Sequence, residues 1–254
     1  MSEGLDLLLD VRAVSKHFGG VYALNNASLS VARGEVHALI GPNGAGKTTL
    51  IHVLSGALPL DGGQVVFDGA DLVKRPMHER VTLGLARSYQ ITNVFPGLSA
   101  LDNVVLAVQG RADAGSSFRF WRPVRDETAL FDDARSYLDQ VGLSSKTGVV
   151  AGQLSHGEQR ALELAMALAT KPQLLLLDEP MAGTGPEESA RMVELIEHLA
   201  RHVTILLVEH DMAAVFRLAD RISVLVNGQL ICSGTPDEVK NDAGVRRAYL
   251  GDHL

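Results

Sequence analysis

The sequence predicts an α/β fold, because short apolar runs of strand length alternate with longer segments of helical period. Three observations support this class. Leu174–Leu177 and Thr204–Val208 are apolar along almost their whole length, as strands buried on both faces of a parallel sheet are. A glycine-rich segment follows the apolar run Val36–Ile40, at the position of a turn from strand to helix. Within Glu158–Ala169, apolar residues recur at the i, i+3, i+4, i+7 spacing of one buried helix face.

The first half of the chain is expected to begin with a strand-rich part and to become helical later. Val36–Ile40 is predicted to be a buried strand and Lys47–Ser55 a helix. Gln64–Phe67 follows the turn residues Asp-Gly-Gly, which predicts one strand of an antiparallel pair. Ala100–Leu143 has helical period, but it is interrupted by Gly110–Pro123, a stretch rich in Gly, Ser and Arg that is predicted to form a surface excursion.

The second half is expected to return to alternating helices and strands. The predicted helices are Glu158–Ala169, Glu187–His202 and Asp211–Ala219, and the predicted strands are Leu174–Leu177, Thr204–Val208 and Ile222–Val226. No repeat occurs at a fixed interval, so a repeat architecture is not expected.

Composition excludes several classes of protein. The 254 residues are enough to bury a core without metal or disulfide staples. Cys232 is the only cysteine, so neither an intramolecular disulfide nor a cysteine-based zinc site is possible, and a reducing cytoplasm is the expected compartment. The net charge of −7 disfavours nucleic acid as a partner. The N-terminal segment is acidic where a signal peptide is basic, and the apolar runs have strand length, so we expect neither export nor a membrane-spanning helix.

Residues 41–48 read GPNGAGKT, which matches the phosphate-binding pattern G-x-x-x-x-G-K-[ST] between a predicted strand and a predicted helix. The glycines allow backbone N–H groups and the helix N-terminus to point at phosphate oxygens. Lys47 is expected to reach the β- and γ-phosphates, and Thr48 to bind Mg²⁺. The alternative is a glycine-rich turn that matches by chance. The residues assigned to nucleotide binding here are Gly41, Pro42, Asn43, Gly44, Ala45, Gly46, Lys47, Thr48 and Thr49.

Two carboxylates follow the apolar run Leu174–Leu177 and supply the second half of a phosphoryl-transfer site. Adjacent residues of a strand point to opposite faces, so Asp178 and Glu179 have different roles unless the strand has already ended. We assign Asp178 to hydrated Mg²⁺ and Glu179 to the attacking water as general base. A solvated strand end is the alternative for the pair taken alone.

Residues 154–160 read LSHGEQR and lie at the start of the helix that precedes the strand with the two carboxylates. They resemble the signature motif of ABC ATPases, usually written LSGGQ, with departures at His156 and Glu158. Taken alone, the residues indicate an N-cap at Ser155 with Glu158 completing a capping box, and the same helix end is also an anion site. The resemblance implies that Ser155, Gly157 and Glu158 face the γ-phosphate of an ATP held by another subunit.

Further positions fall in the order of the family. Gln90 resembles the Q-loop glutamine, which implies contacts with the metal and the attacking water. His210 resembles the switch histidine that holds the γ-phosphate, although a histidine after a strand is by itself more often structural. Phe18 resembles the aromatic residue that stacks on adenine, with Tyr22 as a substitute and core packing as the alternative for either ring.

One departure concerns the D-loop, where the family usually carries an aspartate near the position of Gly185. Gly185 has no side chain to form a hydrogen bond across a dimer, so communication between two ATP sites through this position is an open question. The resemblance is strongest to the ATP-binding subunits of branched-chain amino acid importers, and residues 110–123 resemble the longer of the two such subunits. The stretches that carry it are FGGVYAL at 18–24, GLARSYQITNVFPGLSALDNVV at 84–105, EPMAGTGPE at 179–187 and the C-terminal stretch 234–251.

The resemblance implies an α/β P-loop NTPase fold of the ABC ATPase type, with a RecA-like core, an N-terminal antiparallel β subdomain and a helical subdomain. These parts are expected within a single domain, 1–254. The core with its antiparallel part covers about 1–90 and 160–235, the helical subdomain about 91–159, and a C-terminal tail about 236–254.

The function implied is that of an ATP-binding and ATP-hydrolysing subunit of an importer for branched-chain amino acids or related small solutes. ATP and Mg²⁺ are the expected cofactors. The expected partners are transmembrane permease subunits, a second ATPase subunit and, indirectly, a solute-binding protein, with no nucleic acid. The expected location is the cytoplasmic face of the plasma (inner) membrane. The segment 94–98 is a candidate docking surface for the permease, with core packing as its alternative.

Two other classes remain to be compared with this one. A soluble ABC ATPase of translation or DNA repair usually pairs two ATPase modules or carries a long coiled-coil insertion, and the sequence has neither. In a nucleotide kinase or GTPase, the signature segment and His210 have no role.

Overall fold

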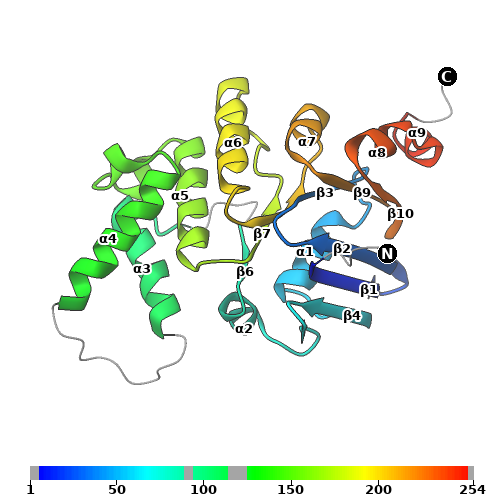
Figure 1. The fold of residues 1–254 in the computed structure, drawn as a ribbon, viewed down its shortest axis with the longest axis horizontal. Coiled ribbons are helices and arrows are strands. Elements are labelled where there is room, and N and C mark those ends of the chain that lie inside the picture. The colour runs from blue at the N-terminus through cyan, green and yellow to red at the C-terminus, as the bar shows by residue number, and fades with distance from the viewer. Residues whose placement is uncertain (1–5, 89–93, 114–124, 251–254) are drawn as a thin grey trace.

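The computed structural model describes residues 6–88, 94–113 and 125–250, and Figure 1 shows two β-sheets with helices around them. The larger sheet has six strands and lies at the centre of the fold. Its strands, in the order in which they lie side by side, are β10 (Gln229–Gly234), β9 (Arg221–Val226), β3 (Val36–Ile40), β8 (Thr204–Val208), β7 (Leu174–Asp178) and β6 (Leu85–Arg87).

Five of these strands are parallel, and only β10 runs antiparallel to its neighbour β9. β3, β7 and β8 are buried along their whole length. Because β8 pairs with both β3 and β7, the carboxyl ends of these three strands lie at one edge of the sheet. Parallel α/β sheets bind their ligands at that edge.

The smaller sheet is antiparallel and is formed by the N-terminal part of the chain. Its strands, in order, are β2 (Val21–Ala32), β1 (Leu7–Phe18), β4 (Gly62–Phe67) and β5 (Ala70–Asp71). Register shifts interrupt the β1–β2 ladder, and Ala13 and Asn26 have positive φ angles of 48° and 53°. Such bulges bend and twist the strands.

The two faces of the six-stranded sheet are covered by different parts of the chain. Leu174 and Leu176 of β7 pack in a core with the smaller sheet and α1 (Lys47–Ser55). The alternate residues Leu175 and Leu177 pack in a second core with the helical part of the molecule. Because side chains alternate between the two faces along a strand, α1 lies on one face of the sheet and the helical part lies on the other.

The helical part consists of three helices that pack on one another. They are α3 (Ala100–Asp113), α4 (Arg125–Gln140) and α5 (His156–Ala169), with short 3₁₀ turns η1 (Ser144–Lys146) and η2 (Ala151–Gln153) before α5. The remaining helices are α2 (Met77–Thr82), α6 (Pro186–Leu199), α7 (Met212–Leu218), α8 (Pro236–Asn241) and α9 (Ala243–Leu250).

A buried arginine anchors the end of α1. The guanidinium of Arg80, which is 4% exposed, donates hydrogen bonds to the carbonyl oxygens of Val53 and Leu54, each at 2.7 Å. These carbonyls belong to the last turn of α1, where backbone carbonyls lack the N–H of a following helical turn, and that of Val53 also accepts from the N–H of Gly56 at 3.2 Å. Arg80 therefore fixes the far end of the helix that begins at the phosphate loop.

The structure confirms the α/β class and most of the predicted elements. Val36–Ile40, Lys47–Ser55 and Thr204–Val208 have the predicted bounds. The surface excursion was predicted to begin at Gly110, and this start is wrong, because α3 continues through Asp113. One glycine costs a helix only about 1 kcal/mol, which the buried face of α3 offsets. Residues 114–124 of the excursion lie outside the described part of the chain.

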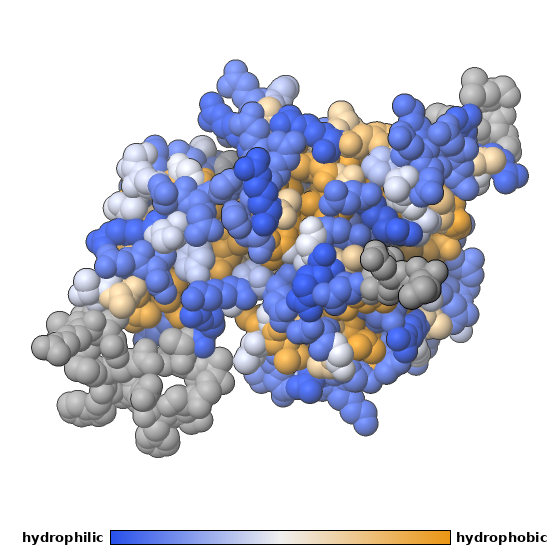
Figure 2. Space-filling model, in the orientation of Figure 1, coloured by the Kyte–Doolittle hydropathy of each residue, from blue (hydrophilic) through white to orange (hydrophobic). Residues whose placement is uncertain are grey.

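The predicted helix Glu187–His202 is also corrected, because α6 ends at Leu199. None of the helices within the described ranges is long and apolar enough to cross a bilayer. Hydrophilic residues cover most of the face shown in Figure 2, and hydrophobic residues show mainly toward its centre and its right-hand side.

Candidate active site

The loop from β3 to α1 requires glycine at two positions because the backbone of other strands approaches it closely. A Cβ on Gly41 would lie 2.1 Å from the carbonyl oxygen of Leu225. A Cβ on Gly46 would lie 2.3 Å from the carbonyl oxygen of Ala23, and Gly46 also has a left-handed φ of +106°. Gly44 has a φ of +79° but open space around it. Strands β9 and β2 therefore fix the path of the loop.

Lys47 is buried inside this loop. Its Nζ donates hydrogen bonds to the carbonyl oxygens of Gly41, at 2.7 Å, and Pro42, at 3.2 Å. Burial lowers the pKa of Lys47, while the negative charges of Glu179 and Asp178 oppose that shift. The ammonium is thus held within the field of both carboxylates and has a third N–H donor for a phosphate. Thr48 and Thr49 follow it at the start of α1, and both are half-buried.

Asp178 is the last residue of β7 and is 2% exposed. Its Oδ2 accepts a hydrogen bond from Arg87 Nη2 at 3.1 Å. Its Oδ1 is buried and has no hydrogen-bond partner among the described residues. Burial raises the pKa of Asp178, and the charge of Arg87 opposes that rise. A buried carboxylate oxygen that lacks a partner fits a site for hydrated Mg²⁺, a cation that prefers oxygen ligands.

The described residues bring together no group of three or more His, Cys, Asp or Glu side chains that could hold a metal ion. A Mg²⁺ ion at Asp178 would therefore take its other ligands from water, from hydroxyl groups and from phosphate. This is the usual arrangement for Mg²⁺ in enzymes that act on nucleotides.

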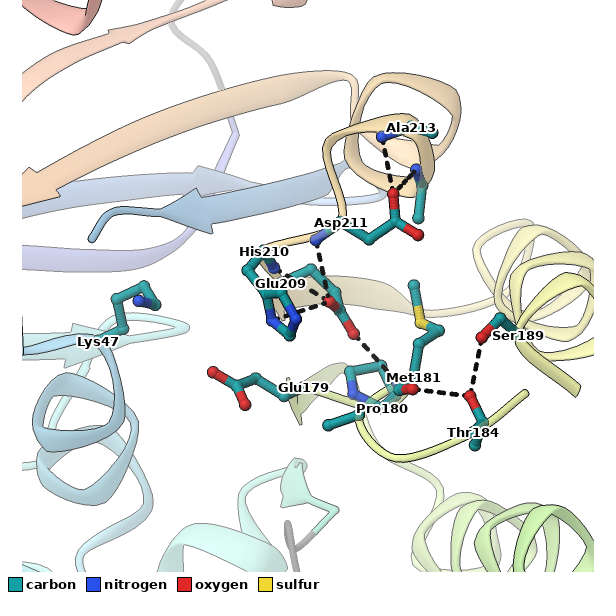
Figure 3. A network of polar contacts seen from close by, with 12 residues as sticks. Lys47, Glu179, Pro180, Met181, Thr184, Ser189, Glu209, His210, Asp211 and Ala213 are labelled. Atoms are coloured by element: carbon teal, nitrogen blue, oxygen red, sulfur yellow. Dashed lines mark hydrogen bonds and ion pairs between the residues drawn. The ribbon is translucent and has the colours of Figure 1, made fainter. Parts of the chain in front are cut away.

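Glu179 does not follow the alternation of side chains along β7. The residue has a positive φ of 51°, and its backbone N–H donates to the carbonyl oxygen of Val208 at 2.9 Å. β7 has therefore ended at Asp178. Figure 3 shows the carboxylate of Glu179 directed into the space that Lys47 and His210 also face. Asp178 and Glu179 can then act on different atoms of one ligand.

His210 follows β8 and has an exposed imidazole, with its side chain 64% exposed. Its backbone N–H donates to Oε2 of Glu209 at 3.0 Å. The other carboxylate oxygen of Glu209 accepts from the backbone N–H of Met181, also at 3.0 Å. One buried carboxylate thus connects the His210 segment with the turn that follows Glu179, as the dashed lines in Figure 3 show.

A second connection reaches the same turn from α5. The guanidinium of Arg160 donates to the carbonyl oxygens of Glu179, at 3.1 Å, and Ala182, at 2.7 Å, and also contacts that of Pro180. Arg160 is 9% exposed. The signature segment and the turn after Glu179 are therefore held in a fixed relation.

The predicted capping box at the start of α5 is confirmed. Ser155 Oγ accepts from the backbone N–H of Glu158 at 3.3 Å, and Glu158 Oε2 accepts from the backbone N–H of Ser155 at 2.9 Å. This bond from Ser155 is the main cause that lowers the pKa of Glu158. Gly157 lies against α6, where a Cβ would be 3.2 Å from a carboxyl atom of Glu188. A cavity of about 380 Å³ borders all three signature residues.

Within the described part of the chain, no hydrogen bond or ion pair joins these signature residues to the Lys47 loop. They belong to α5 in the helical part, whereas Lys47 begins the helix on the other face of the sheet. The structure therefore brings together Lys47, Asp178, Glu179 and His210, and it leaves Ser155, Gly157 and Glu158 apart from them.

The two candidate aromatic residues lie at the tip of the β1–β2 hairpin. Phe18 is 51% and Tyr22 58% exposed, so core packing explains neither ring. Lys16 Nζ lies 5.7 Å from the centroid of the Phe18 ring. Tyr22 directly precedes Ala23, whose carbonyl oxygen borders Gly46. The hairpin therefore lies beside the phosphate loop.

Gln90, the candidate Q-loop glutamine, lies outside the described residues.

Sequence reasoning missed three residues of this site: Arg87, Arg160 and Glu209. The only available signal was a charged residue placed directly beside a motif or at the end of a buried strand. Arg160 follows the signature segment, and Glu209 follows β8. Apart from His210, which directly follows Glu209, their partners in the site are 19 to 91 residues away in the chain, and only the tertiary structure reveals them.

A phosphate loop before α1, a buried strand that ends in two carboxylates and a histidine after the neighbouring strand define a P-loop nucleoside triphosphatase. A family model described as ABC transporter matches residues 24–182, and another described as Branched-chain amino acid ATP-binding cassette transporter matches residues 229–254. The chain belongs to the ABC transporter family and is an ABC ATPase.

Relatives of full length support this assignment. The chain is 36% identical to the high-affinity branched-chain amino acid transport ATP-binding protein LivG of Salmonella typhimurium, over 96% of this chain and 98% of that protein. It is 35% identical to BraF of Pseudomonas aeruginosa, which has the same description, with the same coverage. The lipopolysaccharide export system ATP-binding protein LptB of Escherichia coli is 32% identical, over 96% of this chain and 97% of that protein.

Solved structures agree with the fold. The crystal structure of the ADP conformation of MJ1267, an ATP-binding cassette of an ABC transporter, has a TM-score of 0.81 at 30% identity, with 97% of this chain and 99% of that chain covered. A nucleotide-free cassette from an ABC transporter has a TM-score of 0.82 at 30% identity, with 97% and 100% covered.

Proposed function

We propose that the chain is the ATP-hydrolysing subunit of an ABC importer, and that Lys47, Asp178, Glu179 and His210 are its catalytic centre. One observation carries the proposal: Glu179 turns out of β7 into the space that Lys47 and His210 face (Figure 3). This supports a site in which a carboxylate, an ammonium and an imidazole would surround the γ-phosphate above the loop.

Binding of ATP would rest on the loop. Lys47 would contact the β- and γ-phosphates, and the backbone N–H groups of the loop would hold the other phosphate oxygens. Phe18, with Tyr22 as its alternative, would stack on adenine. Thr48, Gln90 and Oδ1 of Asp178, which has no hydrogen-bond partner among the described residues, would hold Mg²⁺, and this ion would neutralise phosphate charge. The further contacts would come from Gly41, Pro42, Asn43, Gly44, Ala45, Gly46 and Thr49.

For hydrolysis, Glu179 would accept a proton from the attacking water, with Gln90 as a further contact of that water. His210 would donate a hydrogen bond to the γ-phosphate as negative charge develops there. Glu179 is suited to this because the left-handed turn carries it away from Asp178, so the carboxylate assigned to the metal and the general base are separate groups.

Each subunit would hold half of a complete ATP site. Among the described residues, no hydrogen bond or ion pair joins Ser155, Gly157 or Glu158 to the Lys47 loop of their own chain, yet the N-terminus of α5 is suited to an anion. A second ATPase subunit, identical or homologous, would bring its α5 to the γ-phosphate. ATP binding would then drive closure of the pair, and hydrolysis would permit opening.

The substrate class rests on the similar proteins. The C-terminal match at residues 229–254 and the relatives LivG and BraF are described by branched-chain amino acid transport, whereas LptB is described by lipopolysaccharide export. We therefore propose branched-chain amino acids or related small solutes, delivered by a solute-binding protein to transmembrane permease subunits. The chain would act at the cytoplasmic face of the plasma membrane. None of the named relatives supports a role in translation or DNA repair.

The segment before α3 offers a docking surface for the permease. Phe95 is 53% and Leu98 37% exposed, so core packing does not explain either side chain, although Val94 packs partly against the core. The fully buried Asn103 holds this segment, because its side chain accepts from the N–H of Phe95 at 2.7 Å and donates to the Phe95 carbonyl at 3.1 Å. The backbone is thus fixed while the ring is left exposed.

The proposal is tested in a complex reconstituted with its permease subunits in lipid vesicles. We expect ATP hydrolysis and uptake of a branched-chain amino acid that both depend on the solute-binding protein. Lys47→Ala removes both activities by loss of ATP binding, and Glu179→Gln removes hydrolysis while ATP still binds. Full hydrolysis by the Glu179→Gln complex contradicts the role of Glu179, and hydrolysis without uptake of any such solute contradicts the importer assignment.

A further inference from the structure

We propose that Glu209 is a positioning residue that couples the setting of His210 to the turn after Glu179, and that it acts through its two separate carboxylate oxygens. The inference rests on the proposed function and extends it to the communication between parts of the site. Glu209 is 1% exposed, so it cannot contact solvent or a partner directly.

The two oxygens of this carboxylate serve different segments. Oε1 accepts from the N–H of Met181, and Oε2 accepts from the N–H of His210, both at 3.0 Å. The N–H of Asp211 lies 3.5 Å from Oε2, and the imidazole Nδ1 of His210 lies 3.7 Å from it. A rigid planar group therefore bridges two loops, and a movement of either loop displaces the other.

The turn on the Met181 side is itself held firmly. Thr184 Oγ1 donates to the carbonyl oxygen of Met181 at 2.7 Å and also lies 2.8 Å from Ser189 Oγ, which belongs to α6. Met181 is thus fixed through its N–H by Glu209 and through its carbonyl by Thr184 (Figure 3). A change in the position of α6 reaches His210 through this chain of bonds.

This route matters because Gly185 offers no side chain for contact across a subunit interface. A contact made at Gly185 itself would therefore use backbone groups, and within the same turn Glu209 accepts from the backbone N–H of Met181. A buried carboxylate is suited to the task, since it only accepts hydrogen bonds and can accept from both loops at once.

Two variants test whether the bridge depends on the carboxylate group or on the length of the side chain. Glu209→Gln keeps the shape, but its amide nitrogen is a donor, so one of the two N–H groups loses its acceptor. Glu209→Asp keeps the charge, but it is about 1.5 Å shorter, so it cannot span both loops. Asp220→Asn is the matched control. The Asp220 carboxylate also accepts from a backbone N–H, that of Val36 at 2.8 Å, but Val36 is the first residue of β3 and so lies at the end of the strand away from the candidate site.

The test is single-turnover ATP hydrolysis by the assembled transporter, together with the KM for ATP and the melting temperature. We expect both Glu209 variants to lower the hydrolysis rate about tenfold, the effect of losing one hydrogen bond to a charged group. KM should stay unchanged, and Asp220→Asn should keep the wild-type rate. In a His210→Ala background, Glu209→Gln should cause no further loss, because Glu209 acts through His210.

Wild-type rates in both Glu209 variants would overturn the inference. So would a Glu209→Gln loss that multiplies fully with that of His210→Ala, since this is the result of a purely structural role. Failure of the proposed function looks different: the wild-type complex then shows no hydrolysis that depends on Lys47.

Discussion

Arg87 Nη2 lies 3.1 Å from Asp178 Oδ2, and the two side chains are only 5% and 1% exposed. The pair connects neighbouring strands β6 and β7 at the edge of the sheet where the candidate site lies. Arg87 holds one oxygen of the carboxylate, and the other oxygen has no hydrogen-bond partner among the described residues. The arrangement supports the proposed cation site, at a cost in stability that the burial of the charge imposes.

Asp178→Asn tests this cost. Burial raises the folded-state pKa of Asp178 above its ordinary value of 3.8, so the ionised carboxylate is disfavoured in the fold. Such a group contributes stability below pH 3.8 that is lost as the pH rises through the folded-state pKa. The uncharged Asn avoids this loss. We expect the melting temperature of the nucleotide-free variant to exceed that of the wild type by a margin that grows upward from about pH 4.

The same variant should lose ATP hydrolysis that depends on Mg²⁺. Melting curves across the pH range and a hydrolysis assay measure the two effects. A variant that melts below the wild type at neutral pH would show that Asp178 is stabilised by Arg87 more than burial destabilises it.

Gly46→Ala should disrupt the phosphate loop, whereas Gly44→Ala should be tolerated better. Both residues have left-handed backbones, which cost an L-residue about 1–2 kcal/mol. Only at Gly46 does the new Cβ also collide with a carbonyl oxygen, that of Ala23 at 2.3 Å. Chemical denaturation and ATP binding measure the difference. Equal losses in the two variants would mean that β2 yields to the new methyl group.

Ser155→Ala separates the structural role of the cap from its expected role in the ATP site. Removal of a helix N-cap costs about 1 kcal/mol of stability. The chain offers a matched control in α8, where Thr235 and Glu238 form the same capping box. We expect Ser155→Ala and Thr235→Ala to lower stability equally, but only Ser155→Ala to abolish hydrolysis by the transporter. Similar hydrolysis rates would leave Ser155 as a cap alone.

Arg160→Met should destabilise the turn after Glu179. The variant leaves three carbonyl groups without the donors that the guanidinium supplies, which costs about 2–4 kcal/mol in a buried setting. Arg217→Met is the control, since it removes an arginine whose ion pair with Glu197 lies on the surface. Thermal unfolding should show a large loss for the first variant and little change for the second. Equal melting temperatures would contradict the proposed anchoring.

Much of the fold could be predicted because its signals are local. The apolar residues of β3 and β8 are contiguous, and the phosphate loop supplies the boundary of α1, so these elements follow from short segments. The bounds of β1 and β2 could not be predicted in the same way. Their ladder contains bulges, with positive φ at Ala13 and Asn26, and each bulge interrupts the alternation that identifies a strand.

The candidate site was predicted where a motif supplies the residues, and missed where tertiary contacts decide. Lys47, Asp178, Glu179 and His210 lie in recognisable segments, and the structure brings them together. The direction of Glu179 depends on one left-handed residue, and the roles of Arg160 and Glu209 depend on backbone groups far away in the chain. No pattern in the sequence encodes those partners.

The central claim is that one ATP lies between the Lys47 loop of one subunit and the signature helix of another. The most direct measurement is the structure of the Glu179→Gln transporter with ATP and Mg²⁺ bound. The account predicts that Ser155 Oγ of one ATPase subunit lies within about 3.2 Å of a γ-phosphate oxygen of the ATP on the facing Lys47 loop. An ATP bound by a single subunit, with Ser155 of the other subunit far from the γ-phosphate, would contradict it.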